Sequence, residues 1–291
     1  MREPLTVVLI HWNQPERCVR TAATFATQGV PLELVVVDNG SSSEAVAHLR
    51  WELPDARIIE LGHNIGFGPA ANAGLRWWLE HGSGEWAAVA PHDALPEPDC
   101  LRLLLDAASA RPHAGLASAE YGEPGKPVVD RYFGGILVES DRRPGWEDAG
   151  HPHGTLMVVR RECLEDIGLF DERYFAYCEE ADLGERARRA GWDVGVVWGA
   201  VVRNPSWNVG SAMADYLMLR NSLLLVRHHF GRYPAFIRLM MAIGSTAWQL
   251  VAPKRRSPVF SPAARGRAIR DFMRGRFGPP PVEYLLASRG T

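Results

Sequence analysis

Cysteine is scarce in this sequence and follows no pattern. The chain has 291 residues and only four cysteines: Cys18, Cys100, Cys163 and Cys178. Such scattered spacing argues against a disulfide framework and against a structural zinc site. No charged-then-apolar leader precedes the first apolar run, so we expect no signal peptide. The expected location is therefore the reducing cytoplasm.

A continuous apolar run long enough to span a bilayer is also missing. The nearest approach is 234–252, where Arg238 is the one charged residue. Glycine or polar side chains interrupt it at Gly244, Ser245, Thr246 and Gln249. Because a spanning helix needs about 20 apolar residues, we predict an interfacial or buried helix here.

Acidic residues are nearly absent from one segment near the C-terminus. Residues 254–276 contain eight basic residues and one acid, Asp271, although the formal net charge of the whole chain is −2. The segment fits a contact with a membrane surface and equally a solvated tail, and both interpretations stay open. Few aromatic residues interleave with its charges, so we expect no nucleic-acid partner.

The N-terminal part alternates apolar runs with helical patterns. The runs that read as buried strands are 6–10, 32–37, 57–61 and 86–90. A strand–helix–strand order with short loops predicts parallel pairing with right-handed crossovers. We predict an α/β fold, a mostly parallel central sheet flanked by helices, over 1–210. A helical extension, 211–291, would follow and carry the basic tail.

Polar residues follow each of these runs. They are Asn13, Asp38 and Asn39, His63 and Asn64, and His92 and Asp93. Ligands of open α/β sheets bind outside the carboxyl ends of the strands, and a nucleotide pocket needs such polar groups. Asp93 is a candidate ligand for a divalent cation, which would neutralise a diphosphate. The alternative is that Asp93 only begins the turn before Pro96.

The turn 62–74 is rich in glycine without being a dinucleotide fingerprint. It lacks the GxGxxG order, and no acid stands at the expected distance after it. Its glycines allow close backbone approach and positive φ. A phosphate or ribose contact and a tight entry into the next helix are both open.

A group of acids stands near a predicted helix start. Glu179, Glu180 and Asp182 lie at the N-terminus of a helix predicted over 181–190. The helix dipole alone favours acids there, by ~0.3–1 kcal/mol each. It does not account for the aromatic residues of 174–177, which would shield a carboxylate and raise its pKa towards that of a useful base.

The stretch 115–150 has the weakest pattern in the chain. We predict irregular antiparallel strands and loops there. They would lie on the side of the pocket where the acceptor, a second substrate, binds. His151 and His153 follow and point the same way if that stretch is extended. A metal-binding pair and ordinary loop histidines are both open.

Several stretches carry a family resemblance when taken together. They are VVLIHWNQPE, VVVDNGSSSE, GHNIGFGPAANAG, APHDALPEPD, IGLFDERYFAYCEEADLGERARRAGW and YLMLRNSLLL. In them the chain resembles a family 2 glycosyltransferase with the GT-A fold, of the rhamnosyltransferase-like type. The resemblance covers about residues 7–227.

The resemblance implies a nucleotide-diphosphate sugar donor, UDP- or dTDP-linked, with dTDP-rhamnose favoured. The donor-binding residues that it implies are His11, Asn13, Asp38, Asn39, Asn64, Gly66, Asn72, His92, Asp93 and Arg203. Asp93 matches the last acid of the family's metal motif and would hold Mg²⁺ or Mn²⁺. Glu180 matches the general base, with Glu179 beside it. His153 and Asp182 would lie on the acceptor side.

The sequence departs from the family's pattern in three places. The metal motif, Pro91-His92-Asp93, keeps one acid. Glu180 stands where aspartate is usual, so the base would reach one methylene further. Arg203 replaces a histidine that many relatives have, and its charge would meet the diphosphate and lessen the need for metal.

The predicted function is an inverting glycosyltransferase. A glycan, a lipid-linked sugar and a natural product are all open as acceptor. The alternative is a nucleotide-sugar-binding or scaffold protein with reduced catalysis, which the eroded metal motif favours. A site at the inner face of the membrane and a homodimer through the C-terminal helices also stay open.

Overall fold

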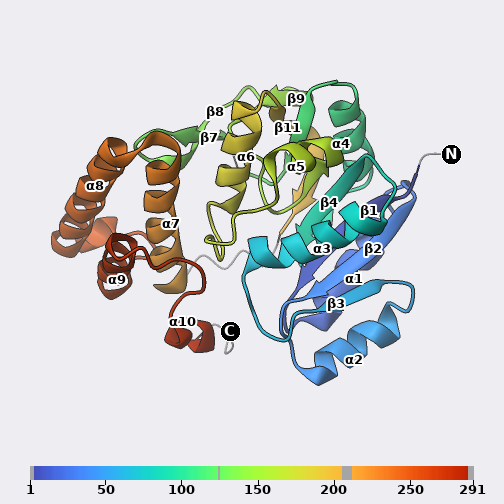
Figure 1. The fold of residues 1–291 in the computed structure, drawn as a ribbon, viewed down its shortest axis with the longest axis horizontal. Helices are drawn as coiled ribbons and strands as arrows, with labels where there is room; N and C mark the ends of the chain where they lie inside the picture. The colour runs from blue at the N-terminus through green and yellow to red at the C-terminus, as the bar shows by residue number, and fades with distance from the viewer. Residues whose placement is uncertain (1–2, 124, 205–211, 288–291) are drawn as a thin grey trace.

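The computed structural model describes residues 3–123, 125–204 and 212–287. The first half of the chain builds one side of a central sheet, and its helices connect the strands (Figure 1). These elements are β1 (Leu5–His11), α1 (Pro15–Ala26), β2 (Leu32–Asp38), α2 (Ser43–Glu52), β3 (Arg57–Glu60), α3 (Phe67–His81) and β4 (Trp86–Pro91). All four strands pair in parallel, as the strand–helix–strand order predicts.

The second half completes the sheet with mixed pairing. Its elements are β5 (Leu95–Pro96), α4 (Cys100–Ser109), β6 (Ala114–Glu120), β7 (Gly125–Asp130), β8 (Gly134–Glu139), β9 (Gly145–Asp148), β10 (Met157–Arg160), α5 (Arg161–Ile167), α6 (Glu179–Arg189) and β11 (Asp193–Arg203). The strand order is β3-β2-β1-β4-β10-β6-β11-β5, with β9 paired to β11. β10 is antiparallel to both of its neighbours, whereas β6 and β11 are parallel.

The predicted α/β fold is confirmed, and one part of the prediction is corrected. The stretch 115–150 is not irregular throughout, because β6 is a buried strand in the middle of the sheet. Its small side chains explain the weak pattern in the sequence. The β7–β8 hairpin forms a separate two-stranded sheet.

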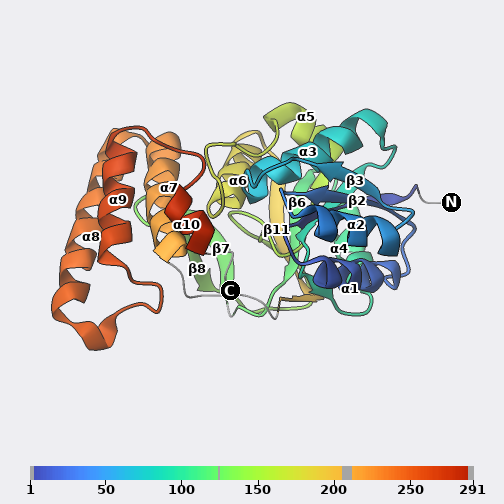
Figure 2. The same cartoon turned by 90° about the horizontal axis from the view of Figure 1, so that it is seen from below.

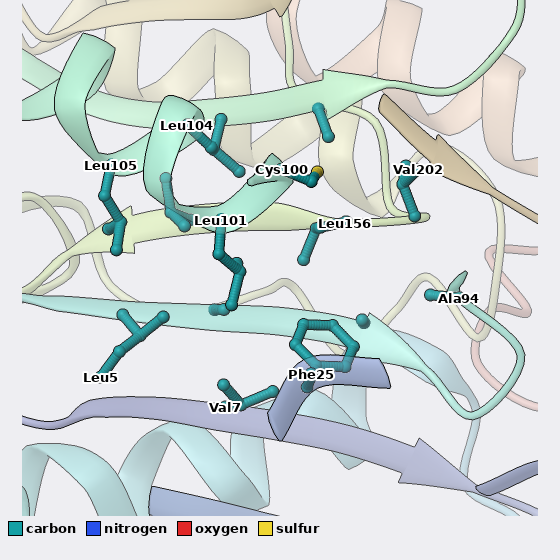
Figure 3. Close-up of a cluster of buried hydrophobic side chains, with 14 of the residues drawn as sticks. Leu5, Val7, Phe25, Ala94, Cys100, Leu101, Leu104, Leu105, Leu156 and Val202 are labelled. Atoms are coloured by element: carbon teal, nitrogen blue, oxygen red, sulfur yellow. The ribbon is translucent and has the colours of Figure 1, made fainter. Parts of the chain in front are cut away.

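Two apolar layers hold the sheet between its helices. Successive residues of a strand point to opposite faces, and in β1 both faces are buried. Val7 and Leu9 join the core under α1 and α4, while Val8 and Ile10 join the core under α3. Figure 3 shows the first layer, with leucines of α4 and Phe25 of α1 over the strands.

The C-terminal helices form a third layer beside the sheet domain. They are α7 (Ala212–Phe230), α8 (Arg232–Val251), η1 (Pro253–Arg255), α9 (Pro262–Met273) and α10 (Val282–Ala287). In both views α8 is the outermost of them, and α7 lies nearest to α6 and to the β7–β8 hairpin (Figures 1 and 2). The predicted boundary at 210/211 falls outside the described residues. Among the described helices, none combines the length and apolarity needed to cross a membrane.

Candidate active site

A cavity of about 660 Å³ opens between the sheet domain and α7. Its walls come from the β7–β8 hairpin, the loop 151–155, the segment 176–181 and Met218 of α7. Pro91 and Asn204, at the ends of β4 and β11, also line it. The cavity therefore reaches the sheet edge where the strand-end polar residues were predicted to gather.

The predicted acid pair lies in this cavity at the start of α6. The helix begins at Glu179, two residues before the predicted start, so Glu179 and Glu180 belong to its first turn. The two residues before it, Tyr177 and Cys178, have φ angles of 68° and 73°. Non-glycine residues rarely adopt this left-handed conformation, which costs free energy unless neighbours hold it.

Asn221 of α7 holds this strained turn. Its side-chain amide donates to the carbonyl oxygens of Ala176 and Tyr177, at 2.8 and 2.9 Å. Asn221 is fully buried, and its own Oδ1 accepts a hydrogen bond from Nε of Arg220. The orientation of the acids thus depends on a residue more than 40 positions further along the chain.

The two acids have different environments. Glu179 is 3% exposed, and its Oε2 has no hydrogen-bond partner among the described residues. Glu180 is half-buried and faces the cavity. A Cβ atom on Gly154 would lie 2.2 Å from Oε1 of Glu180, so only glycine leaves room for this carboxylate.

Burial raises the pKa of both acids, most strongly that of Glu179. For Glu179 the charge of Glu180 adds to the effect of burial. For Glu180 the backbone N–H groups of Glu180 itself and of Gly154 oppose the effect of burial without cancelling it. When two coupled carboxyls share one charge, this arrangement favours the proton on Glu179 and the charge on Glu180, the more exposed of the two acids that line the cavity.

A row of polar residues lies at the carboxyl ends of β2, β1 and β4, as predicted. His11 and Asp38 are register partners, and Nδ1 of His11 lies 2.9 Å from Oδ1 of Asp38. The ring of His92 meets that of His11 edge-on, with centroids 5.7 Å apart. Asp93 follows at once in the chain, so the row leads from Asp38 to the Asp93 carboxylate.

Asp38 is buried and ionised. Burial pushes its pKa up, but hydrogen bonds from His11 and Ser41 outweigh burial and the net pKa is lowered. Asn13 lies beside this group, because its backbone N–H donates to Oγ of Ser41 and its Oδ1 accepts from the N–H of Ser42. The loops after β1 and β2 are thus joined into one surface.

The glycine-rich turn is tied to both halves of the site. Asn39 donates to Oδ1 of Asn64 and to the carbonyl of Gly66. Gly66 has a φ of 100°, and a Cβ atom there would lie 2.1 Å from the carbonyl oxygen of Phe175. The close approach that glycine permits therefore packs the turn against the segment leading to the acid pair, in addition to starting α3.

Two predicted site residues are already engaged elsewhere. The amide of Asn72 is buried against the backbone of Phe170, and it also donates to Glu172. Asp182 is buried against His229 and Arg186 and does not line the cavity. These two predictions of ribose and acceptor contacts are not supported by the geometry, because both side chains point into the protein.

Arg203 is placed differently from the expectation as well. It stands at the end of β11, its side chain is 74% exposed, and it pairs with Glu97. The neighbouring Asn204 instead turns towards the site and donates to Oδ1 of Asp93 at 3.0 Å. A contact of Arg203 with a diphosphate would require the pair with Glu97 to open.

His153, which was predicted to lie on the acceptor side, lines the cavity. Its ring stacks on Tyr121 with centroids 3.5 Å apart, and Thr155 bonds to its Nδ1. Burial lowers the pKa of His153 to about 3, so the ring stays neutral. Stacking and the Thr155 contact account for this histidine without a metal ion.

Two places offer groups that bind metal ions. The first is Asp93, whose Oδ1 accepts a hydrogen bond from Asn204. A single carboxylate suits a Mg²⁺ or Mn²⁺ ion that takes its other ligands from phosphate and water. Asp182, His228 and His229 form the other group, within 4.8 Å of one another. There Arg173 contacts His228 and Arg186 pairs with Asp182, so arginines already occupy positions where a cation would bind.

The sequence did not point to several of the cavity's residues. Asn204 and Tyr121 belong to no recognisable motif, and the β7–β8 hairpin lies in the stretch 115–150, which has the weakest sequence pattern. Asn221 belongs to one of the stretches that carry the resemblance, YLMLRNSLLL. That stretch was the available signal for Asn221, although its contact with 176–177 was not foreseeable.

Comparison with known proteins extends these observations. A model of glycosyl transferase family 2 matches residues 6–168. An N-acetylglucosaminyl-diphospho-decaprenol L-rhamnosyltransferase of Mycobacterium tuberculosis is 28% identical over 279 residues, which cover 82% of this chain and 89% of that protein. A low-salt glycan biosynthesis hexosyltransferase of Haloferax volcanii is 25% identical over 80% of this chain and 78% of its own length.

Solved structures share the fold. A mannosyltransferase from Pyrobaculum calidifontis, in complex with GDP-Man and Mn²⁺, aligns over all of this chain and 80% of its own, with a TM-score of 0.60 and 19% identity. GalNAc-T7 with UDP, GalNAc and Mn²⁺ aligns over 94% of this chain and 56% of its own, with a TM-score of 0.62 and 12% identity. The family match spans more than half of the chain, and the chain therefore belongs to glycosyl transferase family 2, with the GT-A fold.

Proposed function

We propose that this glycosyltransferase inverts the anomeric centre of a UDP- or dTDP-linked sugar and uses Glu180 as its general base. The observation that carries the proposal is the position of Glu180 in the cavity. It is the member of the acid pair whose pKa burial raises less. Pro91, which precedes His92 at the end of β4, and Asn204, which donates to Asp93, line the same cavity. A base and a donor-binding edge thus share one space.

The proposed reaction is a single displacement. The acceptor hydroxyl oxygen forms a bond to the anomeric carbon while its proton passes to the Glu180 carboxylate. The bond between the anomeric carbon and the diphosphate oxygen breaks on the opposite face, and the nucleoside diphosphate leaves.

The donor would lie along the row from Asp38 to Asp93. Asp38, held by His11, would bind the nucleoside base, and the turn with Asn64 and Gly66 would follow the ribose and diphosphate. Asp93, steadied by Asn204, would hold Mg²⁺ or Mn²⁺. When bound, such an ion neutralises charge on the diphosphate leaving group. Mn²⁺ accompanies the nucleotide or nucleotide sugar in both solved relatives described above.

We further propose dTDP-rhamnose as donor and a lipid-linked sugar diphosphate as acceptor. The mycobacterial relative is named for L-rhamnosyl transfer to such a lipid. Leu137 and Met218 line the cavity and are 44% and 48% exposed. Exposed apolar side chains at the cavity suit an acceptor that carries a lipid.

Glu180→Gln is the direct test of the base. The amide keeps the size of the side chain and cannot accept the proton, so we expect transfer to fall by about 10²–10⁴-fold while donor affinity, measured by calorimetry, stays unchanged. In the native enzyme the acid limb of the pH–rate profile should lie above the ordinary carboxyl pKa, because burial raises the pKa of Glu180. In Glu180→Gln this limb should be absent. Glu80→Gln, an exposed acid on α3, is the control. Retained turnover in Glu180→Gln would refute the assignment.

The same assay addresses the alternative of a nucleotide-sugar-binding protein with reduced catalysis. The single acid in the metal motif is the observation that favours this alternative. A protein of that kind would bind dTDP-rhamnose and neither transfer nor hydrolyse it, with or without acceptor. We expect hydrolysis or transfer in the native chain.

A further inference from the structure

The outward side of α8 is an apolar surface that none of the described residues covers. We name it the α8 outer face, made of Tyr233, Phe236, Met240, Ile243, Trp248 and Val251, each between 42% and 76% exposed. Side chains recur on one side of a helix every three or four positions, and these residues follow that spacing except for the five-residue step from Ile243 to Trp248. The opposite side, with Ala235 and Ala242, is buried against α7 and α9.

No charged residue interrupts the α8 outer face. The helix contains no acid, and its two charged residues are Arg232 and Arg238. Arg238 turns inward and donates to Oγ of Ser222 on α7. Contiguous exposed apolar surface of this kind is rare on a protein that meets only water, and it marks a contact with another molecule or with a membrane.

Cations stand at both ends of the α8 outer face. Arg232 is exposed at its start, and Lys254 is exposed just beyond its end. Arg256 donates to the carbonyl oxygens of Gln249 and Leu250, so its charge is held at the last turn of the helix. Among the side chains that the structure describes, no carboxylate forms an ion pair with these three.

From this pattern we infer that the α8 outer face docks on the surface of an anionic lipid bilayer. Apolar side chains would enter the boundary between headgroups and acyl chains, and the flanking cations would meet lipid phosphates. This inference rests on the proposed lipid-linked acceptor, which resides in such a bilayer. Met218, on the helix against which α8 packs, lines the cavity, so docking would bring the cavity close to its acceptor.

A second copy of the chain fits the surface less well. If two α8 helices packed antiparallel, Arg232 of one would meet Lys254 and Arg256 of the other. If they packed parallel, each cation would meet its own counterpart. Like charges come together in both arrangements and oppose association, whereas anionic headgroups neutralise the same charges.

Vesicle flotation of the purified full chain tests the inference. The probes are vesicles of phosphatidylcholine alone and of phosphatidylcholine mixed with an equal part of phosphatidylglycerol. We expect flotation with the mixed vesicles, weakened by salt. Phe236→Glu/Trp248→Glu should reduce the bound fraction by at least about tenfold. Trp51→Glu, at a site 82% exposed on α2, is the matched control and should float like the native chain.

Activity separates this inference from the proposed function. The double variant should keep transfer to a water-soluble acceptor with a short lipid and lose it with acceptor embedded in vesicles. Equal flotation of the native chain and the double variant, or no flotation of either, would overturn the inference. It would also be overturned if light scattering found a dimer that the double variant dissociates and vesicles failed to bind the native chain. If transfer fails in every format while flotation holds, the proposed function is at fault and the docking face stands.

Discussion

Glu179 and Glu180 are neighbours in the chain and yet occupy different electrostatic positions. Both line the cavity, but Glu179 is almost fully buried and its Oε2 has no hydrogen-bond partner among the described residues, whereas Glu180 is half-buried beside Gly154. Because a buried charge is expensive and two adjacent charges more so, the pKa of both carboxyls is raised, most strongly that of Glu179. In the proposed mechanism a neutral Glu179 would not compete with Glu180 for the acceptor proton.

Asp93 gives a prediction at the residue scale. Asp93→Ala should weaken dTDP-sugar binding in the presence of Mg²⁺ or Mn²⁺ by about tenfold or more, since the metal ion would lose its protein carboxylate. Calorimetric titration with and without EDTA measures this. The native chain should lose affinity in EDTA, and the variant should be indifferent to it.

Asp99→Ala is the control for Asp93→Ala, because Asp99 is an exposed acid that pairs with Arg102. If the native chain binds donor equally well with and without EDTA, Asp93 does not hold a metal ion that matters for binding. The arginine at position 203 would then be the next candidate for contact with the diphosphate.

At the scale of elements, α7 controls the shape of the turn before α6. Asn221 satisfies two carbonyl groups of this turn, and the left-handed Tyr177 and Cys178 depend on that support. Arg220, beside it, donates to the carbonyl of Gly278 and to Tyr216, whose hydroxyl donates to Asp271 of α9. A continuous set of hydrogen bonds thus joins the C-terminal helices to the acid pair.

Asn221→Ala should lower kcat more than it changes donor binding. The substitution removes the side-chain donor of two partly buried carbonyl groups, so we expect the turn to relax and Glu180 to move. We expect the acid limb of the pH profile to shift, because the burial that sets the pKa of Glu180 changes with it. A purely structural role for Asn221 would lower the melting temperature and leave this limb in place.

Ser222→Ala is the matched control for Asn221→Ala. Ser222 is the next residue of α7 and is also buried, but its hydroxyl donates to Leu219 and accepts from Arg238, and within the described part of the chain it forms no hydrogen bond with the turn before α6. Ser222→Ala should lower the free energy of unfolding without shifting the acid limb of the pH profile. Equal kinetic effects of the two variants would show that Asn221 has no special part in positioning the base.

At the scale of the whole molecule, the C-terminal helices share cores with the sheet domain. Phe175 is buried among residues of α7 and α9, and Tyr174 and Ala181 are buried with Leu224 and Leu225. The segment that carries the acid pair therefore contributes to the core of the extension. Large apolar contacts of this kind couple the unfolding of two parts of a chain.

We expect calorimetry to show one unfolding transition for the full chain. Leu225→Ala removes a fully buried side chain from the shared core and should destabilise the whole molecule by ~2–5 kcal/mol. Trp51→Ala, at an exposed site, should leave the free energy of unfolding nearly unchanged. Two separate transitions, with only one shifted by Leu225→Ala, would instead show that the sheet domain and the extension unfold independently.

The sequence was most informative where the structure is periodic or repeats a family pattern. Alternating apolar runs and short loops led to the sheet, and parallel pairing led to the row of His11, Asp38 and Asp93. It did not foresee that the side chains of Asn72 and Asp182 are engaged inside the protein, since a position near a glycine-rich turn or at a helix start does not say which way a side chain faces.

By itself the sequence determined the order of the strands along the chain, the polar residues at their ends and the family. These follow from local patterning and from matched motifs. Only the tertiary structure decided which of Glu179 and Glu180 has the higher pKa and which residue supports the turn before α6. It also decided which side of α8 remains exposed to solvent. Those properties arise from contacts between residues far apart in the chain, such as Asn204 with Asp93 and Asn221 with Tyr177. Burial and pairing, which set charge and exposure, exist only once the chain has folded.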